Sequence, residues 1–413
     1  MEKYSLYKDS GVQWLGQIPS HWEMKRFRFL LTENAMLNTD LKERKQLQFR
    51  YGDIVQKANQ DEDADVLKTI QKYTVVQPGD IMINGLNLNY DFISQRVAQV
   101  QEPGVITSAY ISLRPAAGVN SKYYTYFMKA MDAQKMFHGM GSGVRLTLAY
   151  ANLKNMFFPY PTPTEQDAIV DYLDTATAKI DEGISQQQRL IDLLNERKEA
   201  LIEQAVTKGI IDGSWKTRRL RHVCKFRNGY TPSKNVAAYW DNGTIPWFRM
   251  EDIRLHGRKL DVAEQYITDK AVKGDGLFEA GSFILATSAT VGEHALLLVD
   301  ALSNQRFTNL KIDDSLIGEL SNEFFFYFLY HIDRKCKEFT NGTTFASVNA
   351  EDLKNILVGI PSPEEQEAIV SYLDSKTEGL DQAINLAKKQ IDMLQERKQI
   401  IINDVVTGKV KVV

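Results

Sequence analysis

The strongest signal in this sequence is an internal duplication. Residues 161–209 recur at 361–409 without a gap, and 22 of the 49 aligned positions are identical. Both copies read P-x-P-x-E-Q-x-A-I-V-x-Y-L-D and both carry an Glu-Arg-Lys triplet near the far end, at 196–198 and 396–398. A repeat of this length predicts two copies of one structural unit rather than two unrelated domains.

The duplication continues upstream in weaker form. Trp22 precedes the basic stretch KRFRF, and Trp215 precedes KTRRLRH. The turn-like segment 77–81 resembles 279–283, and the aromatic stretches at 121–128 and 321–328 correspond. Each half of the chain is therefore expected to be a variable globular region followed by a nearly copied helix. The predicted organisation is four segments: globular domains at 1–160 and 210–360, and helical repeats at 161–209 and 361–413.

Both helical repeats carry an apolar pattern that steps alternately by three and four residues, which is typical of a coiled-coil seam. The seam is predicted at Leu173, Ile180, Ile184, Ile191, Leu194 and Leu201 in the first repeat and at Leu373, Leu380, Ile384, Ile391, Leu394 and Ile401 in the second. Each helix follows a Pro-x-Pro stop and opens with acidic residues, which suit a helix start. We expect the two helices to pair antiparallel and to hold the globules apart. An amphipathic helix packed on a globular domain remains the alternative.

The globular regions combine short apolar runs with two longer aromatic-rich segments. Strands are expected at 80–84, 105–113, 282–286 and 295–299, where β-formers are bounded by turn residues. Helices are expected at 122–137 and 322–339, with their aromatic side chains more suited to a core than to stacking on bases. The predicted fold class is two α/β domains joined by an antiparallel two-helix coiled coil, related by a pseudo-two-fold repeat.

Composition excludes several classes of protein. The 413 residues contain 43% hydrophobic and 25% charged residues, a mixture typical of globular domains. The densest apolar run, Phe324–Tyr330, is far shorter than the roughly 20 residues of a membrane-spanning helix, so no membrane association is expected. Two cysteines, Cys224 and Cys336, cannot form a disulfide framework and are interpreted as free thiols of a cytoplasmic protein.

The distribution of charge is more informative than the net charge of −3. The first helical repeat holds five basic and ten acidic residues, whereas Gly213–Trp240 holds no acidic residue at all. Local basic clusters of this kind can bind a phosphate backbone even on an acidic chain. A solvated surface is the plain alternative for each cluster.

A protein that recognises a DNA sequence in the major groove uses side chains such as Arg and Asn, which form hydrogen bonds with the edges of guanine and adenine, respectively. The base-reading candidates are the Asn-rich segment 84–89 and Arg145 after the glycine turn in the first half, and Arg249, Arg254 and Thr343 in the second half. The Asn-rich segment and Arg145 are the best of these, and the basic clusters are candidates for phosphate contact. The complete set of DNA-binding candidates is Lys25, Arg26, Arg28, Asn84, Asn87, Asn89, Arg145, Arg218, Arg219, Arg221, Arg227, Arg249, Arg254, Arg258, Lys259 and Thr343.

No catalytic or metal-binding motif accompanies these candidates. The sequence has no GxxxxGK or GxGxxG loop, no HExxH, no Cys/His ligand spacing and no NPPY-type tetrapeptide. The Glu196–Lys198 triplet is superficially like part of a nuclease site, but its copy at 396–398 has the same heptad position. A solvated or interhelical charge pattern explains it better, and no catalytic residue or metal ligand is predicted.

Two motifs carry a resemblance to a known family. The run YKDSGVQWLGQIPSHWEMKRF near the N-terminus resembles the opening of the specificity (S) subunits of type I restriction–modification systems. The two P-x-P-x-E-Q-x-A-I-V-x-Y-L-D repeats, each leading into a long helix, resemble the central and C-terminal repeats of that family. The resemblance is specific over about 110 residues and loose in the globules.

The resemblance implies a non-catalytic subunit that reads a bipartite, asymmetric target in double-stranded DNA through two recognition domains. It also implies two methyltransferase (M) subunits that carry S-adenosylmethionine and restriction (R) subunits that use ATP and Mg²⁺, so that the complex methylates adenine or restricts DNA. Three alternatives stay open: a specificity subunit of a methylation-only system, a coiled-coil scaffold that binds proteins alone, and an enzyme with an unfamiliar site.

Overall fold

The computed structural model describes residues 2–50, 52–58, 63–141, 143, 146–340 and 347–412. The chain forms two compact units, and each unit takes part of both long helices. Unit 1 comprises Met1–Gln188 with Lys389–Val413, and unit 2 comprises Arg189–Lys388.

Unit 1 is built on a four-stranded antiparallel sheet in the order β4–β11–β8–β9. The strands are β4 (Leu31–Glu33), β11 (Ile111–Pro115), β8 (Ile81–Ile83) and β9 (Val97–Gln99). Helix α2 (Ser121–Ala133) is capped by Asn120 and packs its buried aromatic side, including Tyr123 and Phe127, against this sheet. Aromatic residues at 121–128 therefore serve the core, as the sequence indicated.

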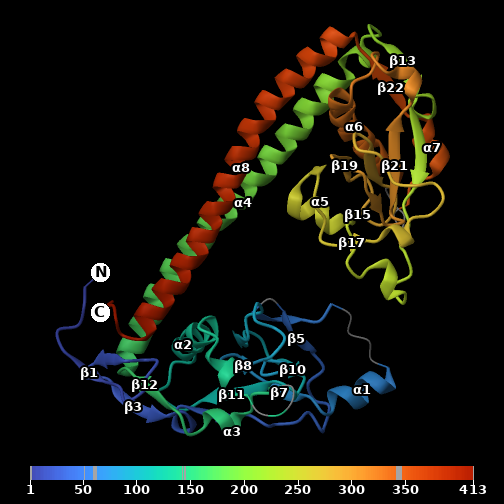
Figure 1. Cartoon of the computed structure of the whole chain (residues 1–413). Coiled ribbons are helices and arrows are strands. Elements are labelled where there is room, and N and C mark those ends of the chain that lie inside the picture. The colour runs from blue at the N-terminus through green and yellow to red at the C-terminus, as the bar shows by residue number, and fades with distance from the viewer. Residues whose placement is uncertain are drawn as a thin grey trace. The chain divides into compact units, whose positions relative to one another are not determined.

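Unit 2 is built on a five-stranded sheet in the order β14–β21–β18–β19–β16. The strands are β14 (Cys224–Asn228), β21 (Phe307–Ile312), β18 (Phe283–Ala286), β19 (His294–Leu297) and β16 (Lys259–Leu260), and β16 pairs parallel with β19. Helix α6 (Asn322–Thr340) lies beside this sheet (Figure 1). Its side chains Phe324, Phe325 and Phe328 are buried in the core of the unit.

The two units share a frame of matching elements. The order β4–β11–β8–β9 in unit 1 corresponds to β14–β21–β18–β19 in unit 2, and α2 corresponds to α6. A two-stranded ladder leads into each long helix: β3 (Glu23–Arg26) with β12 (Phe157–Tyr160), and β13 (Lys216–Arg219) with β22 (Leu357–Ile360). Short helices α3 (Tyr150–Leu153) and α7 (Ala350–Asn355), and 3₁₀ turns η1 (Phe27–Phe29) and η3 (Leu220–His222), also match. The weak upstream repeat in the sequence is thus a repeat of topology.

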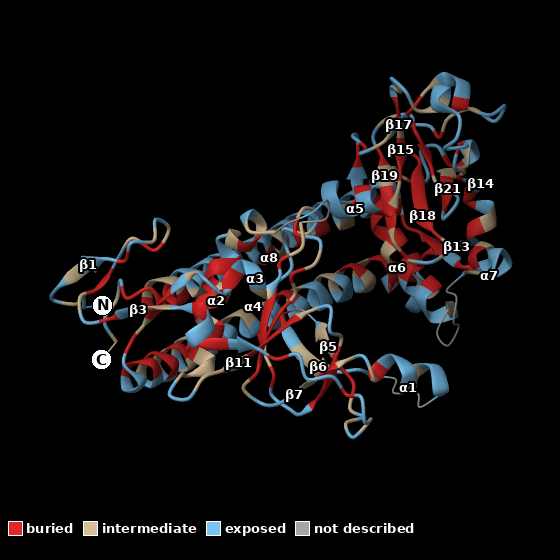
Figure 2. Ribbon diagram, turned by 90° about the horizontal axis from the view of Figure 1, so that it is seen from below, coloured by how far each residue is buried: buried red, intermediate tan, exposed pale blue. Residues whose placement is uncertain are grey.

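Each unit inserts different elements into the frame at the same two places. In unit 1 these are β5 (Leu47–Arg50), β6 (Asp53–Gln56), α1 (Ala64–Ile70), β7 (Thr74–Val76) and β10 (Gly104–Ile106). In unit 2 they are η4 (Ala237–Tyr239), β15 (Ile245–Phe248), α5 (Met250–His256), β16, β17 (Tyr266–Ile267), η5 (Asp269–Ala271) and β20 (Leu302–Ser303). Buried residues shown in red in Figure 2 run through the frame sheets of both units.

One predicted strand is wrong. The apolar segment 105–113 was expected to be continuous, but it forms the end of β10 and the start of β11, which belong to different sheets. A turn separates them, with the Tyr110 N–H donating to the Thr107 carbonyl at 3.3 Å. The hydrophobic run reflects two buried strands on either side of a tight turn, which periodicity alone does not distinguish from one strand.

The long helices are α4 (Pro163–Ile211) and α8 (Pro363–Val406). In unit 1, Lys398 Nζ lies 2.6 Å from Asp181 Oδ1, and in unit 2, Lys198 Nζ lies 2.7 Å from Asp381 Oδ1, an antiparallel correspondence. The predicted fold class, two α/β domains joined by long helices, is therefore confirmed.

Burial along both helices recurs every three or four residues. Leu173, Ile180, Ile191, Leu373, Ile384 and Ile401 are buried, and Ile184, Leu194, Leu201, Leu380, Ile391 and Leu394 are partly buried. Near each domain the seam residues also enter the domain core: Leu173, Ile180 and Ile401 belong to the main core of unit 1, and Leu373 belongs to that of unit 2. The helices therefore pack against each other and against the α/β frame.

Candidate nucleic-acid interface

The two basic clusters predicted to contact phosphate occupy matching places in the frame. Lys25, Arg26 and Arg28 lie on β3 and η1, and Arg218, Arg219 and Arg221 lie on β13 and η3. Both clusters are anchored in the same way: an arginine of the 3₁₀ turn donates a hydrogen bond to an asparagine side chain. The two asparagines, Asn155 and Asn355, are 200 residues apart in the sequence. Arg28 donates to Asn155 Oδ1 at 3.2 Å, and Arg221 donates to Asn355 Oδ1 at 2.6 Å.

The other cations of these clusters also have partners in the frame. Lys25 Nζ lies 3.4 Å from the centroid of the Tyr160 ring, and Arg26 lies over Phe157. Arg218 pairs with Glu319 at 3.3 Å, and Arg219 donates to Asn355 Oδ1 at 3.2 Å. Because both clusters belong to the duplicated frame, they present the same chemistry in both units. Such residues suit contacts with the phosphate backbone of DNA, which do not depend on the base sequence.

Arg227 binds a segment of the insert between β14 and β18 in unit 2. Its guanidinium donates to the carbonyl of Gly276 at 3.2 Å and lies 4.4 Å from the centroid of the Phe278 ring. These contacts fix the chain before β18, so the side chain has a structural task in this unit.

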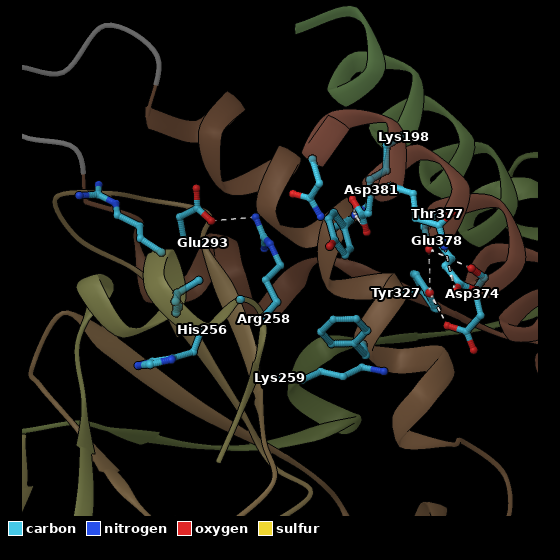
Figure 3. Close-up of a pocket in the computed structure, with 17 residues that line it drawn as sticks. Lys198, His256, Arg258, Lys259, Glu293, Tyr327, Asp374, Thr377, Glu378 and Asp381 are labelled. Carbon is cyan, nitrogen blue, oxygen red and sulfur yellow. Dashed lines mark hydrogen bonds and ion pairs between the residues drawn. The ribbon is translucent and has the colours of Figure 1, made fainter. Parts of the chain in front are cut away.

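The candidates between residues 249 and 259 surround helix α5 but differ in their surroundings. Arg249 precedes the helix, where its backbone N–H donates to Asp252 Oδ2 at 2.6 Å. Arg254 is exposed on the helix, and Lys259 is exposed on β16 with its ammonium 5.5 Å from the Phe326 ring. Arg258 pairs with Glu293 at 2.7 Å and with Asp333 at 2.9 Å. Figure 3 shows Arg258 reaching toward Glu293, so its charge is neutralised inside the unit.

Arg258 belongs to a buried polar cluster. His294 is fully buried on β19 and its Nδ1 contacts Asp333 Oδ2. Burial lowers the pKa of His294, although the Asp333 carboxylate opposes this shift. The arrangement stabilises an aspartate of α6 inside the domain through a guanidinium and an imidazole.

In unit 1 the Asn-rich segment forms the first part of the loop between β8 and β9. Asn84 is partly buried and its Oδ1 accepts the Leu86 N–H at 3.2 Å. Asn87 is exposed and adopts a φ of 52°, in the left-handed region that asparagine tolerates better than most residues. Asn89 is partly buried. Asn87 is therefore the member of this set whose side chain is best placed to meet a ligand.

Sequence reasoning did not single out Arg96, which organises this loop. Arg96 is 1% exposed, and its guanidinium donates to the carbonyls of Asn84, Leu86 and Asp91 at 3.0, 2.8 and 2.7 Å. The available signal was an arginine directly before the short apolar run Val97–Ala98, because an arginine next to a buried strand needs internal partners.

Arg145 and Thr343 lie outside the described residues. The chain immediately after Arg145 does lie against the Asn-rich loop, since Leu146 accepts a hydrogen bond from the Leu88 N–H at 3.2 Å and Leu148 donates to Gly85 at 2.9 Å.

Each unit also contains a groove between its domain and its helices. The unit 2 groove has a cavity of about 860 Å³ and is lined by Lys198, Tyr327, Thr377 and Asp381 among others (Figure 3). The unit 1 groove, of about 630 Å³, is lined by the corresponding Lys398, Tyr126, Thr177 and Asp181. The duplication therefore produces a matched pair of polar surfaces.

Within the described ranges, no three or more His, Cys, Asp or Glu side chains are grouped so that they could hold a metal ion. Among the same residues, no helix combines the length and apolarity needed to cross a bilayer. Cys224 and Cys336 are both buried free thiols. Burial raises the pKa of Cys336 to about 12, which disfavours the reactive thiolate.

Comparison with known proteins matches residues 213–394 to the family model of the type I restriction modification DNA specificity domain. The chain is 45% identical over 148 residues to the type I restriction enzyme EcoprrI specificity subunit of Escherichia coli, covering 36% of this chain. It is 29% identical over 194 residues to the MjaIX specificity subunit of Methanocaldococcus jannaschii, covering 46% of this chain. The chain covers 37% and 43% of the length of these two relatives.

A similar fold occurs in a chain solved in work on complex assembly and conformational transition of the type I R-M system. The TM-score is 0.68 at 15% sequence identity, over 95% of this chain and 99% of that chain. At this identity the likeness concerns the fold.

Proposed function

Because the chain belongs to the family of type I restriction–modification specificity subunits, we propose that it is the non-catalytic subunit that selects the DNA target of a modification and restriction complex. Each α/β domain binds one half of a bipartite, asymmetric site in double-stranded DNA. The complex then methylates adenine at that site or directs restriction.

The observation that carries this proposal is the combination of a repeated frame with two different inserts. Matching frames give both domains the same way of meeting a duplex, and matching basic clusters supply contacts that any sequence can satisfy. Different inserts and loops give the two domains different surfaces, so their half-sites differ. Asn87 in unit 1 and Arg254 in unit 2 are the exposed candidates for reading bases.

Reciprocal variants test this assignment. The chain is assembled with its methyltransferase partner, and binding is measured on duplexes with single base-pair changes across the site. Asn87→Ala should relax discrimination in one half-site and Arg254→Ala in the other, each by roughly 10-fold or more, since a good base contact discriminates by about 1–3 kcal/mol. Each variant is the control for the other. Binding by the assembled wild type that is indifferent to salt and to sequence would falsify the proposal and favour a protein-binding scaffold.

Two M subunits are the proposed partners in modification, with R subunits joining for restriction. The matched grooves support this stoichiometry, because equivalent surfaces on the two units suit two copies of one partner. Replacing the exposed Glu378 of the unit 2 groove with Arg should reduce the mass of the assembled complex by one M subunit. Retention of both M subunits would argue against docking at this groove.

The cofactors of the proposed complex belong to the partners: S-adenosylmethionine on M, and ATP with Mg²⁺ on R. We assign no cofactor to this chain. The proposed compartment is the reducing cytoplasm, where DNA is available and where the two buried thiols remain unpaired.

The paired helices are proposed to set the length of the spacer between the half-sites. Their repeat requires each seam position on α4 to match one on α8, so an insertion in one helix shifts that register. Inserting four residues between 180 and 202 should change the preferred spacer or prevent assembly. An unchanged spacer in an assembled complex would remove the helices from this role.

A further inference from the structure

The loop between β8 and β9 differs from its counterpart in the second domain. Strand β8 ends at Ile83 and β9 begins at Val97, whereas β18 ends at Ala286 and β19 begins at His294. The frame therefore supports a much longer loop in unit 1 at a position where unit 2 makes a short connection. The longer β8–β9 loop is therefore a feature of unit 1 that the repeated frame does not require.

The tip of the longer loop is exposed and apolar. Tyr90, Phe92 and Ile93 are 77, 53 and 94% exposed, respectively. Isolated exposed hydrophobic residues are ordinary, but here three of four consecutive positions are exposed and apolar, and they follow the exposed Asn87 closely in sequence. Aromatic and aliphatic side chains of this kind stack on bases or insert between base pairs.

The base of the loop is held by a buried guanidinium. Arg96 donates to the main-chain carbonyls of Asn84, Leu86 and Asp91, so one side chain ties together the start, the middle and the tip of the loop. Its backbone N–H donates to Asp132 Oδ2 at 2.7 Å, which connects the loop to the core helix α2. The planar fork of arginine can satisfy several acceptors at fixed angles, which the ammonium of lysine cannot.

Further contacts fix the tip. His138 Nε2 lies 3.0 Å from the Asp91 carbonyl, and its ring stacks on Phe92 with centroids 4.6 Å apart. Asp91 Oδ1 accepts the N–H groups of Ile93 and Ser94 at 3.1 and 2.9 Å. An exposed apolar tip on such a constrained base loses little conformational entropy on binding.

We propose that residues 84–93 form the recognition loop of the first half-site and that Arg96 is the positioning residue that holds this loop in its reading conformation. The inference rests on the proposed function, since it assigns a half-site reader within the first domain. Arg96 itself is buried and makes no contact with DNA. It acts through the three carbonyls that it binds.

The first arm of the test needs no DNA. Hydrogen exchange of the amides at 84–93 is compared in the full-length wild type, Arg96→Met and Arg96→Lys. The Met variant keeps most of the volume but loses the donors, so exchange in the loop should accelerate by roughly 10-fold or more, and the Lys variant should restore protection only in part. Unchanged exchange in Arg96→Met would overturn the positioning role, whatever the chain binds.

The second arm measures base discrimination in the complex with the methyltransferase partner. Arg96→Met should reduce discrimination in the first half-site by roughly 10-fold and leave the second half-site unchanged. Arg114→Met is the matched control: Arg114 makes a bidentate pair with the buried Asp80 in the same sheet, at 3.0 and 2.8 Å, but does not touch the loop. It should lower stability and leave discrimination in both half-sites intact.

The outcomes separate the two ideas. Faster exchange with unaltered discrimination would show that the loop is held by Arg96 but does not read the half-site, and the proposed function would stand. Equal loss of discrimination in Arg96→Met and Arg114→Met would indicate general destabilisation and overturn the specific role. A wild-type complex without sequence preference would remove the proposed function, while the exchange result would still report on the loop.

Discussion

In unit 1 the residues between β4 and β8 form the β5–β6 hairpin, α1 and strand β7, around a small cluster that includes Leu47, Val76 and Ile106. In unit 2 the residues between β14 and β18 form α5 and the strands β15 and β17, which pair with β20 from the second insertion point in a three-stranded sheet. A larger cluster of buried residues lies around Trp247 and Phe248. Outside these inserts the two domains share strand order, helix placement and the ladder that enters each long helix. The same frame therefore supports two unrelated surfaces.

The comparison shows where sequence change is tolerated. A seam residue of α4 contacts α8, and a frame residue contacts sheet and helix together, so a change there needs a compensating change elsewhere. An insert with its own cluster of buried residues changes its surface without disturbing that packing. The helical repeats, with 22 of 49 positions identical, are conserved between the two halves while the inserts diverge, and this contrast follows from the difference in packing.

The largest expected effect on the free energy of unfolding comes from core residues of the frame. Phe127 and Phe328 occupy equivalent positions on α2 and α6 and are fully buried. Replacing either by Ala should cost its own unit about 3–5 kcal/mol of unfolding free energy, because each leaves a cavity in a packed core. Urea unfolding followed by hydrogen exchange in each unit measures the costs. A difference of several kcal/mol between the two would break the equivalence of the frames.

A tyrosine on each core helix should give the next largest effect. Tyr126 donates to Asp174 Oδ1 at 2.8 Å, and Tyr327 donates to Asp374 Oδ1 at 2.5 Å. Burial raises the pKa of Tyr126 to about 12, and burial also raises that of Tyr327, so both phenols remain donors at neutral pH. Each Tyr→Phe variant should lose about 1.5–3 kcal/mol.

The two tyrosine variants also test a local difference. Asp174 has a second partner, Lys122, at 2.7 Å, which would still hold the carboxylate after Tyr126→Phe. We therefore expect Tyr327→Phe to be the more costly variant when thermal or urea unfolding is compared. The opposite order would show that the lysine does not compensate for the lost hydroxyl.

A smaller effect should appear in unit 2 alone and depend on pH. Glu203 contacts His331 at 2.8 Å and also Arg334, whereas the position 200 residues later is Asn403, which accepts from Gln134 at 2.6 Å. Burial raises the pKa of Glu203, but the hydrogen bond from His331 and the two nearby positive charges outweigh burial and hold the pKa below its ordinary value. Glu203→Gln should cost about 1 kcal/mol at pH 7.

The sign of the pH dependence follows from the lowered pKa. The stabilisation by Glu203 is present above the ordinary glutamate pKa and disappears as the pH falls through the lowered pKa of the folded state. Unfolding free energies of wild type and Glu203→Gln should therefore converge in acid. Asn403→Ala is the control in unit 1, and its cost should stay constant over the same pH range.

The smallest effect is expected at the matched ion pairs between the helices. Lys198→Met and Lys398→Met should each cost about 0.2–1 kcal/mol, because Asp381 and Asp181 are half exposed and screened by solvent. Double-mutant cycles with Asp381→Asn and Asp181→Asn measure the coupling at low and high salt. Equal coupling energies that fall with increasing salt would show that the two ion pairs are equivalent. A coupling energy in one unit alone would show that they are not.

The duplication and the extent of the helical repeats could be derived from sequence because they are identities at a fixed offset of 200 residues, and the seam pattern could be derived because it is a local periodicity. The strand break at Thr107–Tyr110 could not, since two buried strands of different sheets give one continuous apolar run. Arg258 appeared as one more cation of an exposed cluster, but folding brings Glu293 and Asp333 to its guanidinium. The sequence shows that a residue is charged, but it does not show which residues of opposite charge lie beside it in the fold.

The sequence by itself determined that this protein repeats one architecture and that its two long helices carry matching apolar seams, because identity and heptad spacing are written along the chain. The tertiary structure alone decided which polar residues share a site. Arg96 meets Asn84 and Asp91 only when β8 and β9 pair, and it meets Asp132 only when α2 lies across the sheet. Contacts between residues distant in sequence depend on that packing, and no local pattern encodes them.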